Sequence, residues 1–135
     1  PVNSELLKGV ILELVEKGKY IILSSHQMSS IEEFCSDVVI INRGKTVLKG
    51  NLKEIKEGYK ANRVEVSTDK NIENYIKEFN MDIEFSKNNE YSIKIDSEEK
   101  AHQLLEKLVG NHIEINKFEI KKPTLNDIFI EKVGE

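Results

Sequence analysis

The sequence predicts an α/β layered domain followed by a smaller α+β domain of the ferredoxin-like kind. The apolar runs at residues 20–23 and 38–41 are continuous, which is typical of strands buried on both faces of a parallel sheet. From residue 63 onwards apolar and polar residues alternate, as in a sheet with one solvated face. The change falls at residues 59–62, so we predict domains over residues 1–60 and 61–135.

The first domain opens with a predicted helix over residues 3–17, where apolar residues recur three and four positions apart. Asn3 or Ser4 is the expected cap of this helix, and Gly18 is its expected left-handed end. The first apolar run follows at once, so the domain begins with a helix and then a strand.

A second helix is predicted between the two apolar runs. The spacing of Ser29 and Glu32 matches a capping box and predicts a short helix over residues 30–35. After the second run, Asn42-Arg43-Gly44 predicts a tight turn that folds residues 45–49 back as a hairpin. The order of helix, strand, helix and strand is that of an α/β layered domain.

The second domain has the predicted order β-α-β-β-α-β, which defines the ferredoxin-like arrangement. A turn at Asn88-Asn89 joins the two middle strands as a hairpin. Ser97 is the expected cap of the second helix, and Gly110 is its expected end. In the last strand the alternation changes phase, which predicts a β-bulge near Asn116 or Lys117.

A last helix is predicted from Pro123 and Thr124 onwards. Its apolar positions recur at helical spacing and need a surface to bury against: Leu125, Ile128, Phe129 and Val133. The pattern does not identify that surface, and we assign the helix to the second domain, which directly precedes it.

Charge and composition argue against several classes of function. Residues 1–60 hold nine Lys and Arg against eight Asp and Glu, whereas residues 61–135 hold eleven against sixteen, a net charge of −5. The acidic half is a poor match for a nucleic-acid surface, which needs a local excess of Lys and Arg. No apolar run approaches the roughly 20 residues of a membrane-spanning helix, so we expect a cytosolic protein. The lone Cys35 stands in an apolar context and is expected to be a buried, inert thiol.

His26 is the residue at which the sequence suggests chemistry. It directly follows the first apolar run, at the carboxyl end of the predicted strand, where ligands bind in open α/β sheets. Its polar neighbours supply hydroxyl and amide groups that can hydrogen-bond phosphate oxygens: Ser24, Ser25, Gln27 and Ser29. The same residues can instead cap a helix and satisfy backbone groups, and on the residues alone we favour that structural role.

A longer pattern around His26 resembles the end of an ABC transporter ATP-binding subunit. It comprises an apolar strand ending in Ser24-Ser25-His26-Gln27, a short acidic helix with Ile31-Glu32, a second apolar strand and a hairpin with Asn42-Arg43-Gly44-Lys45. This match covers roughly residues 1–58. The remainder resembles the small accessory domain of drug-, sodium- or antibiotic-export subunits, including Pro-Thr-Leu-x-Asp-Ile-Phe at residues 123–129.

The resemblance implies roles for five residues, on the end of a P-loop ATPase-type layered domain. His26 becomes the switch histidine that contacts the γ-phosphate of ATP and the attacking water, and Ser25 lies beside it at the nucleotide. Pro1, Val2 and Asn3 become the flank of the D-loop. Phosphoryl transfer is catalysed mainly by positioning and charge stabilisation, which such a contact supplies.

Most of the family's nucleotide-binding machinery is absent from these 135 residues. No G-x-x-x-x-G-K-[S/T] occurs to cradle the β- and γ-phosphates, and the glutamine loop, signature sequence, Walker B acid and catalytic glutamate are missing too. Relatives often read Cys-Asp-Arg where this chain has Cys35-Ser36-Asp37, so the ion pair of that arginine is not implied. We therefore expect the C-terminal fragment of an ATPase. The parent uses ATP and Mg²⁺, whereas the fragment alone has no cofactor and is inactive.

The expected partners also follow from the resemblance. It implies a transmembrane permease subunit, a second ATP-binding subunit in a homodimer, no nucleic acid, and a cytoplasmic location on the inner face of the cell membrane. In isolation the fragment is expected to dimerise or swap, because unpaired apolar strand edges invite pairing. We expect no metal site, since His102 and His112 have no Cys, Asp or His at ligand spacing.

Two other functions remain open for the ferredoxin-like domain. It could be a regulatory or dimerisation domain without nucleotide chemistry, with residues 1–58 as its scaffold. It could instead bind RNA, which requires exposed aromatic residues on a basic sheet face. We rank RNA binding lower, because the strands offer only Phe85, Tyr91 and Phe118 within an acidic segment.

Overall fold

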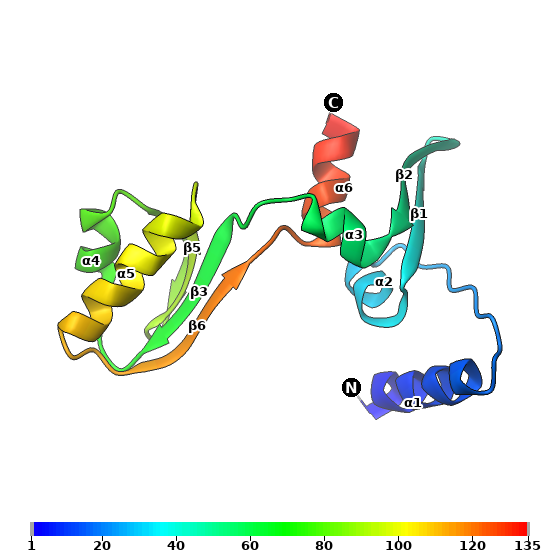
Figure 1. The fold of residues 1–135 in the computed structure, drawn as a ribbon, viewed down its shortest axis with the longest axis horizontal. Coiled ribbons are helices and arrows are strands. Elements are labelled where there is room, and N and C mark those ends of the chain that lie inside the picture. The colour runs from blue at the N-terminus through cyan, green and yellow to red at the C-terminus, as the bar shows by residue number, and fades with distance from the viewer. Residues whose placement is uncertain (1, 135) are drawn as a thin grey trace. The chain divides into compact units, whose positions relative to one another are not determined.

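The computed structural model describes residues 2–134 and divides into two compact units (Figure 1). The first unit is formed by the chain up to Ile55 together with the chain from Leu125 onwards, and the second by Lys56–Thr124. Each unit has its own cluster of buried apolar side chains. The last helix, which we expected in the second domain, therefore belongs to the first unit.

The first unit contains four helices and one hairpin among the described residues: α1 (Val2–Glu16), α2 (Met28–Phe34), β1 (Asp37–Asn42), β2 (Lys45–Asn51), α3 (Leu52–Glu57) and α6 (Leu125–Gly134). Helix α3 crosses the boundary between the two units.

Helix α1 ends as predicted. Gly18 has φ +78°, and its N–H donates to the carbonyl of Val15 at 2.9 Å. The N–H of Lys19 donates to the carbonyl of Leu14 at 3.0 Å, which completes a Schellman cap. The expected cap residues, Asn3 and Ser4, instead lie within the first turn of α1.

The predicted hairpin is confirmed. Strands β1 and β2 pair antiparallel, with Asn42 opposite Lys45 across a two-residue turn. Arg43 and Gly44 both have positive φ, 49° and 75°, as a type I′ turn requires. Asn51 caps α3, because its side-chain oxygen accepts from the N–H of Glu54 at 3.3 Å.

The predicted parallel sheet does not form among the described residues. Residues 19–25 form no strand, and the side chains of Tyr20 and Ile22 are fully exposed, at 102% and 98%. β1 has only β2 as a hydrogen-bonded neighbour, and its burial alternates, with Val39 exposed between buried residues. A strand needs a hydrogen-bonded partner, and within residues 2–134 the segment 19–25 has none.

The capping box predicted for the second helix is also absent. Helix α2 begins at Met28, so Ser29 lies inside the helix instead of preceding it. Gln27 occupies the N-cap position and makes no side-chain cap hydrogen bond. None of the seven residues of α2 is fully buried, so the position of α2 depends on what packs against its partly buried face.

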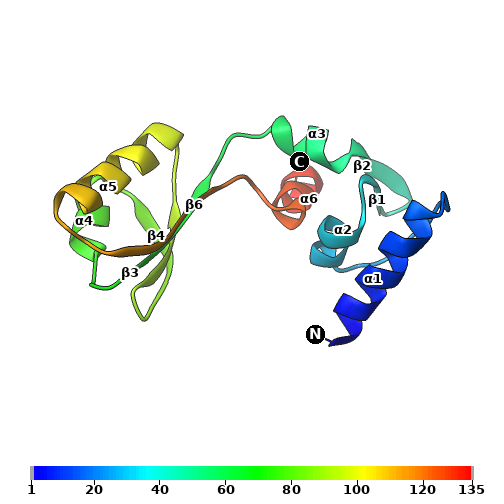
Figure 2. The same cartoon turned by 60° about the horizontal axis from the view of Figure 1, so that its bottom comes forward.

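The core of the first unit joins α6 to the hairpin. The buried members are Val38, Ile40, Leu52 and Leu125, and the residues packed around them include Met28, Ile31 and Phe129. α6 lies beside α2 and β2, as Figure 2 shows for the two helices. The apolar face predicted for the last helix is thus covered within the first unit.

The second unit has the predicted β-α-β-β-α-β order: β3 (Arg63–Thr68), α4 (Glu73–Glu78), β4 (Asp82–Lys87), β5 (Glu90–Lys94), α5 (Glu98–Gly110) and β6 (Ile115–Lys121). The strands form one antiparallel sheet in the order β4-β5-β3-β6, which is the ferredoxin-like order. Helices α4 and α5 cover one face of this sheet (Figure 2). The prediction of an α+β accessory fold is confirmed.

Most local predictions in this unit are confirmed. The turn at Asn88-Asn89 has positive φ at both residues, and Ser97 Oγ accepts from the N–H of Lys100 at 3.4 Å. The predicted bulge lies at Asn116, where the register of β6 against β3 shifts by one residue. Gly110 is the last residue of α5, as expected, although the left-handed position after the helix is taken by His112, at φ 57°.

Candidate functional site

His26 lies at a bend between the extended segment 19–25 and helix α2. Its side chain is exposed, whereas that of Ser25 is half-buried. Ser25 Oγ accepts a hydrogen bond from the backbone N–H of Gln27 at 3.0 Å, which fixes the turn just before α2. The polar turn predicted from the sequence is therefore present, and Ser25 has a local structural role within it.

An open groove of about 530 Å³ lies beside His26. One wall comes from residues 23–26, and another from β1 through Val38, Val39 and Ile41. Met28 of α2 and Phe129 of α6 also line the groove. Sequence reasoning missed Phe129 at this site, because only the packing of α6 against α2 brings it there.

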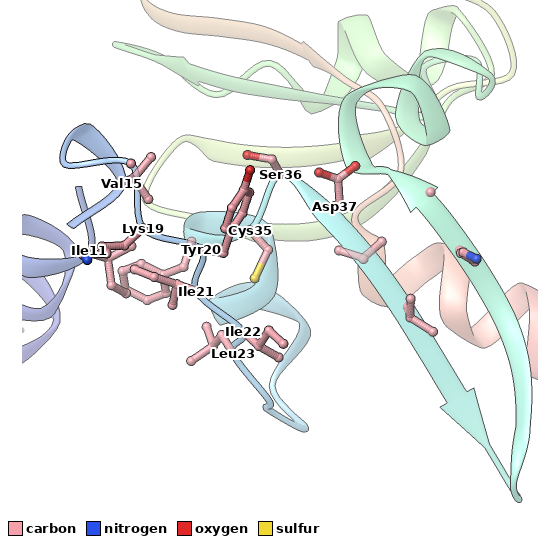
Figure 3. Close-up of a pocket in the computed structure, with 16 residues that line it drawn as sticks. Ile11, Val15, Lys19, Tyr20, Ile21, Ile22, Leu23, Cys35, Ser36 and Asp37 are labelled. Carbon is pink, nitrogen blue, oxygen red and sulfur yellow. The ribbon is translucent and has the colours of Figure 1, made fainter. Parts of the chain in front are cut away.

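A second groove of about 780 Å³ continues along the same extended segment. Residues 19–23 line one side of it, and Cys35, Ser36 and Asp37 line another, at the start of β1 (Figure 3). Ile11 and Val15 of α1 contribute to the lining (Figure 3). Both grooves lie between the segment 19–25 and β1, and both are predominantly apolar.

Cys35 lines both grooves and is half-buried. Burial raises the pKa of its thiol above the ordinary value of 9.0. A raised pKa lowers the thiolate fraction at neutral pH, and the thiolate is the reactive form. Cys35 is thus suited to packing rather than to nucleophilic chemistry.

The other candidate residues do not gather around His26. His102 is exposed on α5, and His112 lies just after the end of that helix in the second unit. Asn3 is exposed in the first turn of α1. Val2 begins that helix, and Pro1 lies outside the described residues. Within residues 2–134, no three His, Cys, Asp or Glu side chains come together as metal ligands do.

The second unit presents a charged outer face on its sheet. Glu65 of β3 accepts from Lys117 Nζ at 2.8 Å and pairs with Lys121 Nζ at 3.3 Å. The hydrogen bond from Lys117 holds the pKa of Glu65 below its ordinary value of 4.5. A bulge at Glu84 turns Phe85 onto the same face, where its side chain is exposed. Without this bulge, Phe85 would lie on the same side of its strand as Ile83.

Residues 50–133 match the family described as "ATP-binding protein DrrA1-3-like, C-terminal domain". The chain belongs to this family of ABC transporter ATP-binding proteins. The matched residues run from the end of β2 through the second unit to α6, so the family's C-terminal domain includes both α3 and the last helix.

Curated relatives extend the match over nearly the whole chain. An uncharacterized ABC transporter ATP-binding protein of Bacillus subtilis, YhaQ, is 35% identical over 135 residues, which cover 99% of this chain and 45% of that protein. A second, from Alkalihalophilus pseudofirmus, is 33% identical over 99% of this chain and 50% of its own length. A fluoroquinolones export ATP-binding protein of Mycobacterium tuberculosis is 32% identical over 49% of this chain and 22% of its own length. The chain spans about half the length of the first two relatives.

No helix within residues 2–134 is both long and apolar enough to cross a membrane.

Proposed function

We propose that this chain is the C-terminal part of an ABC transporter ATP-binding protein whose full-length form binds and hydrolyses ATP to drive export through a membrane permease. Residues 1–60 form the end of its P-loop nucleotide-binding domain, and residues 61–135 form its accessory region. The match to ATP-binding proteins of about twice this length supports the proposal.

The uncovered apolar surface of the first unit carries this proposal. Large apolar side chains are exposed on α1, on the extended segment and on β1: Leu6, Leu7, Val10, Leu12, Leu14, Val15, Tyr20, Ile21, Ile22, Val39 and Ile41. Full burial of one such side chain stabilises a protein by about 1.5–3 kcal/mol. So many exposed apolar side chains therefore indicate that another part of the full-length protein packs on this surface. The second unit, in contrast, buries a cluster of apolar side chains between its sheet and its two helices.

The two grooves indicate where another part of the full-length protein packs on this surface. Segment 19–25 is extended but unpaired, and the β1 edge opposite β2 has no neighbouring strand among the described residues. We propose that a strand of the full-length protein lies between them and pairs with both. Residues 20–23 of this segment then form the parallel strand that the sequence predicted, and His26 lies just beyond its carboxyl end.

In this arrangement His26 contacts the γ-phosphate of bound ATP and the attacking water. Its exposure at the end of the extended segment supports the proposal, because the imidazole is free of a buried packing role. Ser25 serves mainly to hold the turn through Gln27 and lies beside the nucleotide. The chain supplies no loop for the other phosphates and no carboxylate cluster for Mg²⁺ within residues 2–134, so both belong to the rest of the protein.

The decisive experiment is His26→Ala in the full-length protein. Loss of a charge-stabilising contact should lower kcat for ATP hydrolysis by about 100-fold, while the affinity for ATP stays within about threefold. His102→Ala is the matched control, since His102 is also exposed but lies on α5, and it should leave kcat unchanged. Equal turnover of His26→Ala and the unaltered protein would return His26 to the structural role.

The 135-residue chain alone should not hydrolyse ATP, and calorimetric titration should detect no micromolar binding. The partners we propose for the full-length protein are a permease subunit and a second copy of the ATP-binding subunit. These would hold the protein at the inner face of the cell membrane. We propose no nucleic-acid partner, because on the outer sheet face Lys117 and Lys121 are already paired with Glu65.

A regulatory role of the second unit is the second candidate. Its outer face carries the exposed Phe85 beside a groove of about 240 Å³ that Ser92 and Lys117 also line. Asn62 and Lys121 are joined by a backbone hydrogen bond of 3.0 Å, so the ends of the unit are adjacent. Replacing residues 63–120 in the full-length protein by a short Gly-Ser linker should therefore keep basal ATPase activity while changing its coupling to transport. Loss of basal ATPase activity in a folded deletion protein would contradict the regulatory role.

A further inference from the structure

Helix α6 supports the part of the chain that carries His26. Leu125 is fully buried against Val38, Ile40 and Leu52, which attaches α6 firmly to the hairpin. Phe129, one turn further along α6, packs against the edge of the same cluster. Figure 2 shows α6 alongside α2, the helix that directly follows His26.

The start of α2 depends on this packing. Gln27 makes no side-chain cap hydrogen bond, and α2 has no fully buried residue of its own. Its partly buried residues Met28 and Ile31 pack on the cluster that Leu125 and Phe129 complete. Met28 is the first residue of α2 and follows His26 by two positions, so a shift of the helix start also shifts the histidine.

Phe129 also reaches the surface that His26 faces. Both side chains line the groove of about 530 Å³, together with Met28. Truncating a packed aromatic ring leaves a void that neighbouring side chains fill only in part. Met28 is the flexible neighbour best suited to move into that void, and the turn at His26 would follow it.

We propose that Phe129 is a positioning residue for His26 and acts through Met28 at the start of α2. This inference rests on the proposed function of His26 as the switch histidine. A catalytic group misplaced by about 1 Å can cost up to 100-fold in rate, so a supporting residue that touches no substrate can still control turnover. The accessory region of the protein thus supplies a side chain on which hydrolysis depends.

The test is a double-mutant cycle on ATP hydrolysis by the full-length protein. Phe129→Ala should lower kcat by about tenfold with KM for ATP within about threefold, and Phe129→Leu should restore most of the loss. In the His26→Ala background, Phe129→Ala should change kcat less than twofold, because the group it positions is already absent. Phe118→Ala is the matched control, since Phe118 is also partly buried but packs on the core of the second unit, and it should leave kcat unchanged.

Two results would overturn the inference: an unchanged kcat in Phe129→Ala, or an equal loss from Phe129→Ala with and without His26. If Phe129→Ala does not fold, Phe129→Met is carried through the same cycle and judged by the same criterion. An unchanged kcat in His26→Ala alone would instead refute the proposed function, so the two failures are distinguishable.

Discussion

The hydroxyl of Tyr91 accepts a hydrogen bond of 3.2 Å from the backbone N–H of Ile72. Both residues are buried, and Ile72 is the N-cap residue of α4, but its own side chain makes no cap hydrogen bond. A strand residue on β5 thus satisfies one of the free N–H groups at the start of a helix that packs on the same sheet.

Tyr91→Phe should therefore destabilise the second unit by about 1–2 kcal/mol, because it leaves a buried N–H without an acceptor. Hydrogen exchange resolved by residue measures the effect at the amides of α4 and β5. Tyr20→Phe is the control, since the Tyr20 side chain is fully exposed in this chain. Equal protection in the Tyr91→Phe variant and the unaltered chain would mean that water replaces the lost acceptor.

His112→Gly should stabilise the second unit by about 0.5–1 kcal/mol. His112 holds a left-handed φ of 57° at the end of α5, and glycine adopts this conformation without the steric cost of a Cβ. The cap itself is formed by backbone hydrogen bonds, from His112 to Val109 and from Ile113 to Leu108, and these remain in the variant.

His102→Gly provides the opposite comparison, and urea denaturation of both variants measures it. His102 lies inside α5 and is exposed, so glycine there should lower stability by about 0.5 kcal/mol. The same substitution at two exposed histidines should thus change the stability of the second unit in opposite directions. Destabilisation by His112→Gly would show that the imidazole contributes more than its backbone conformation costs.

The ion pairs of Glu65 should make the stability of the second unit sensitive to acid. Lys117 holds the folded-state pKa of Glu65 below its ordinary value of 4.5, so the folded state binds this proton less readily than the unfolded state. The resulting stabilisation is present above about pH 5 and is lost as the pH falls through the folded pKa. Hydrogen exchange of β3 amides between pH 3 and 6 should show a shallower loss of stability in Glu65→Gln.

Salt provides the control for this prediction. Glu65 and Lys117 lie on a solvated face, with 30% and 50% of their side chains exposed, so about 1 M NaCl should reduce the difference between Glu65→Gln and the unaltered chain. If the stability of the two proteins depended on pH in the same way at low salt, the ion pairs of Glu65 would not be the source of the acid sensitivity.

Cys35 reports on the proposed strand of the full-length protein. It lines both grooves beside β1, so iodoacetamide should label it more slowly in the full-length protein than in the 135-residue chain. Mass spectrometry of the peptide that contains Cys35 measures the rates. The control is the double variant Cys35→Ser, Ser36→Cys in the 135-residue chain, which moves the thiol to exposed position 36. This thiol should react faster than that of Cys35, because burial raises the pKa of Cys35. Equal labelling of Cys35 in both lengths would count against a strand in the grooves.

Local patterns in the sequence determined most elements of both units. Gly18 ends α1, the turn at Arg43-Gly44 folds the hairpin, and the change of phase in the last strand marks the bulge at Asn116. These features depend on the backbone conformation and side-chain alternation of neighbouring residues, which a sequence contains directly. The polar turn at His26 was predictable for the same reason.

The packing partners were decided only by the tertiary structure. The last helix has the apolar face that its sequence predicts, yet its burial against α2 and β2, and with it the position of Phe129 beside His26, depends on contacts between residues far apart in the chain. The apolar run at residues 20–23 shows the converse. Its composition favours a buried strand, but a strand forms only where a neighbour supplies hydrogen bonds, and no described strand pairs with it.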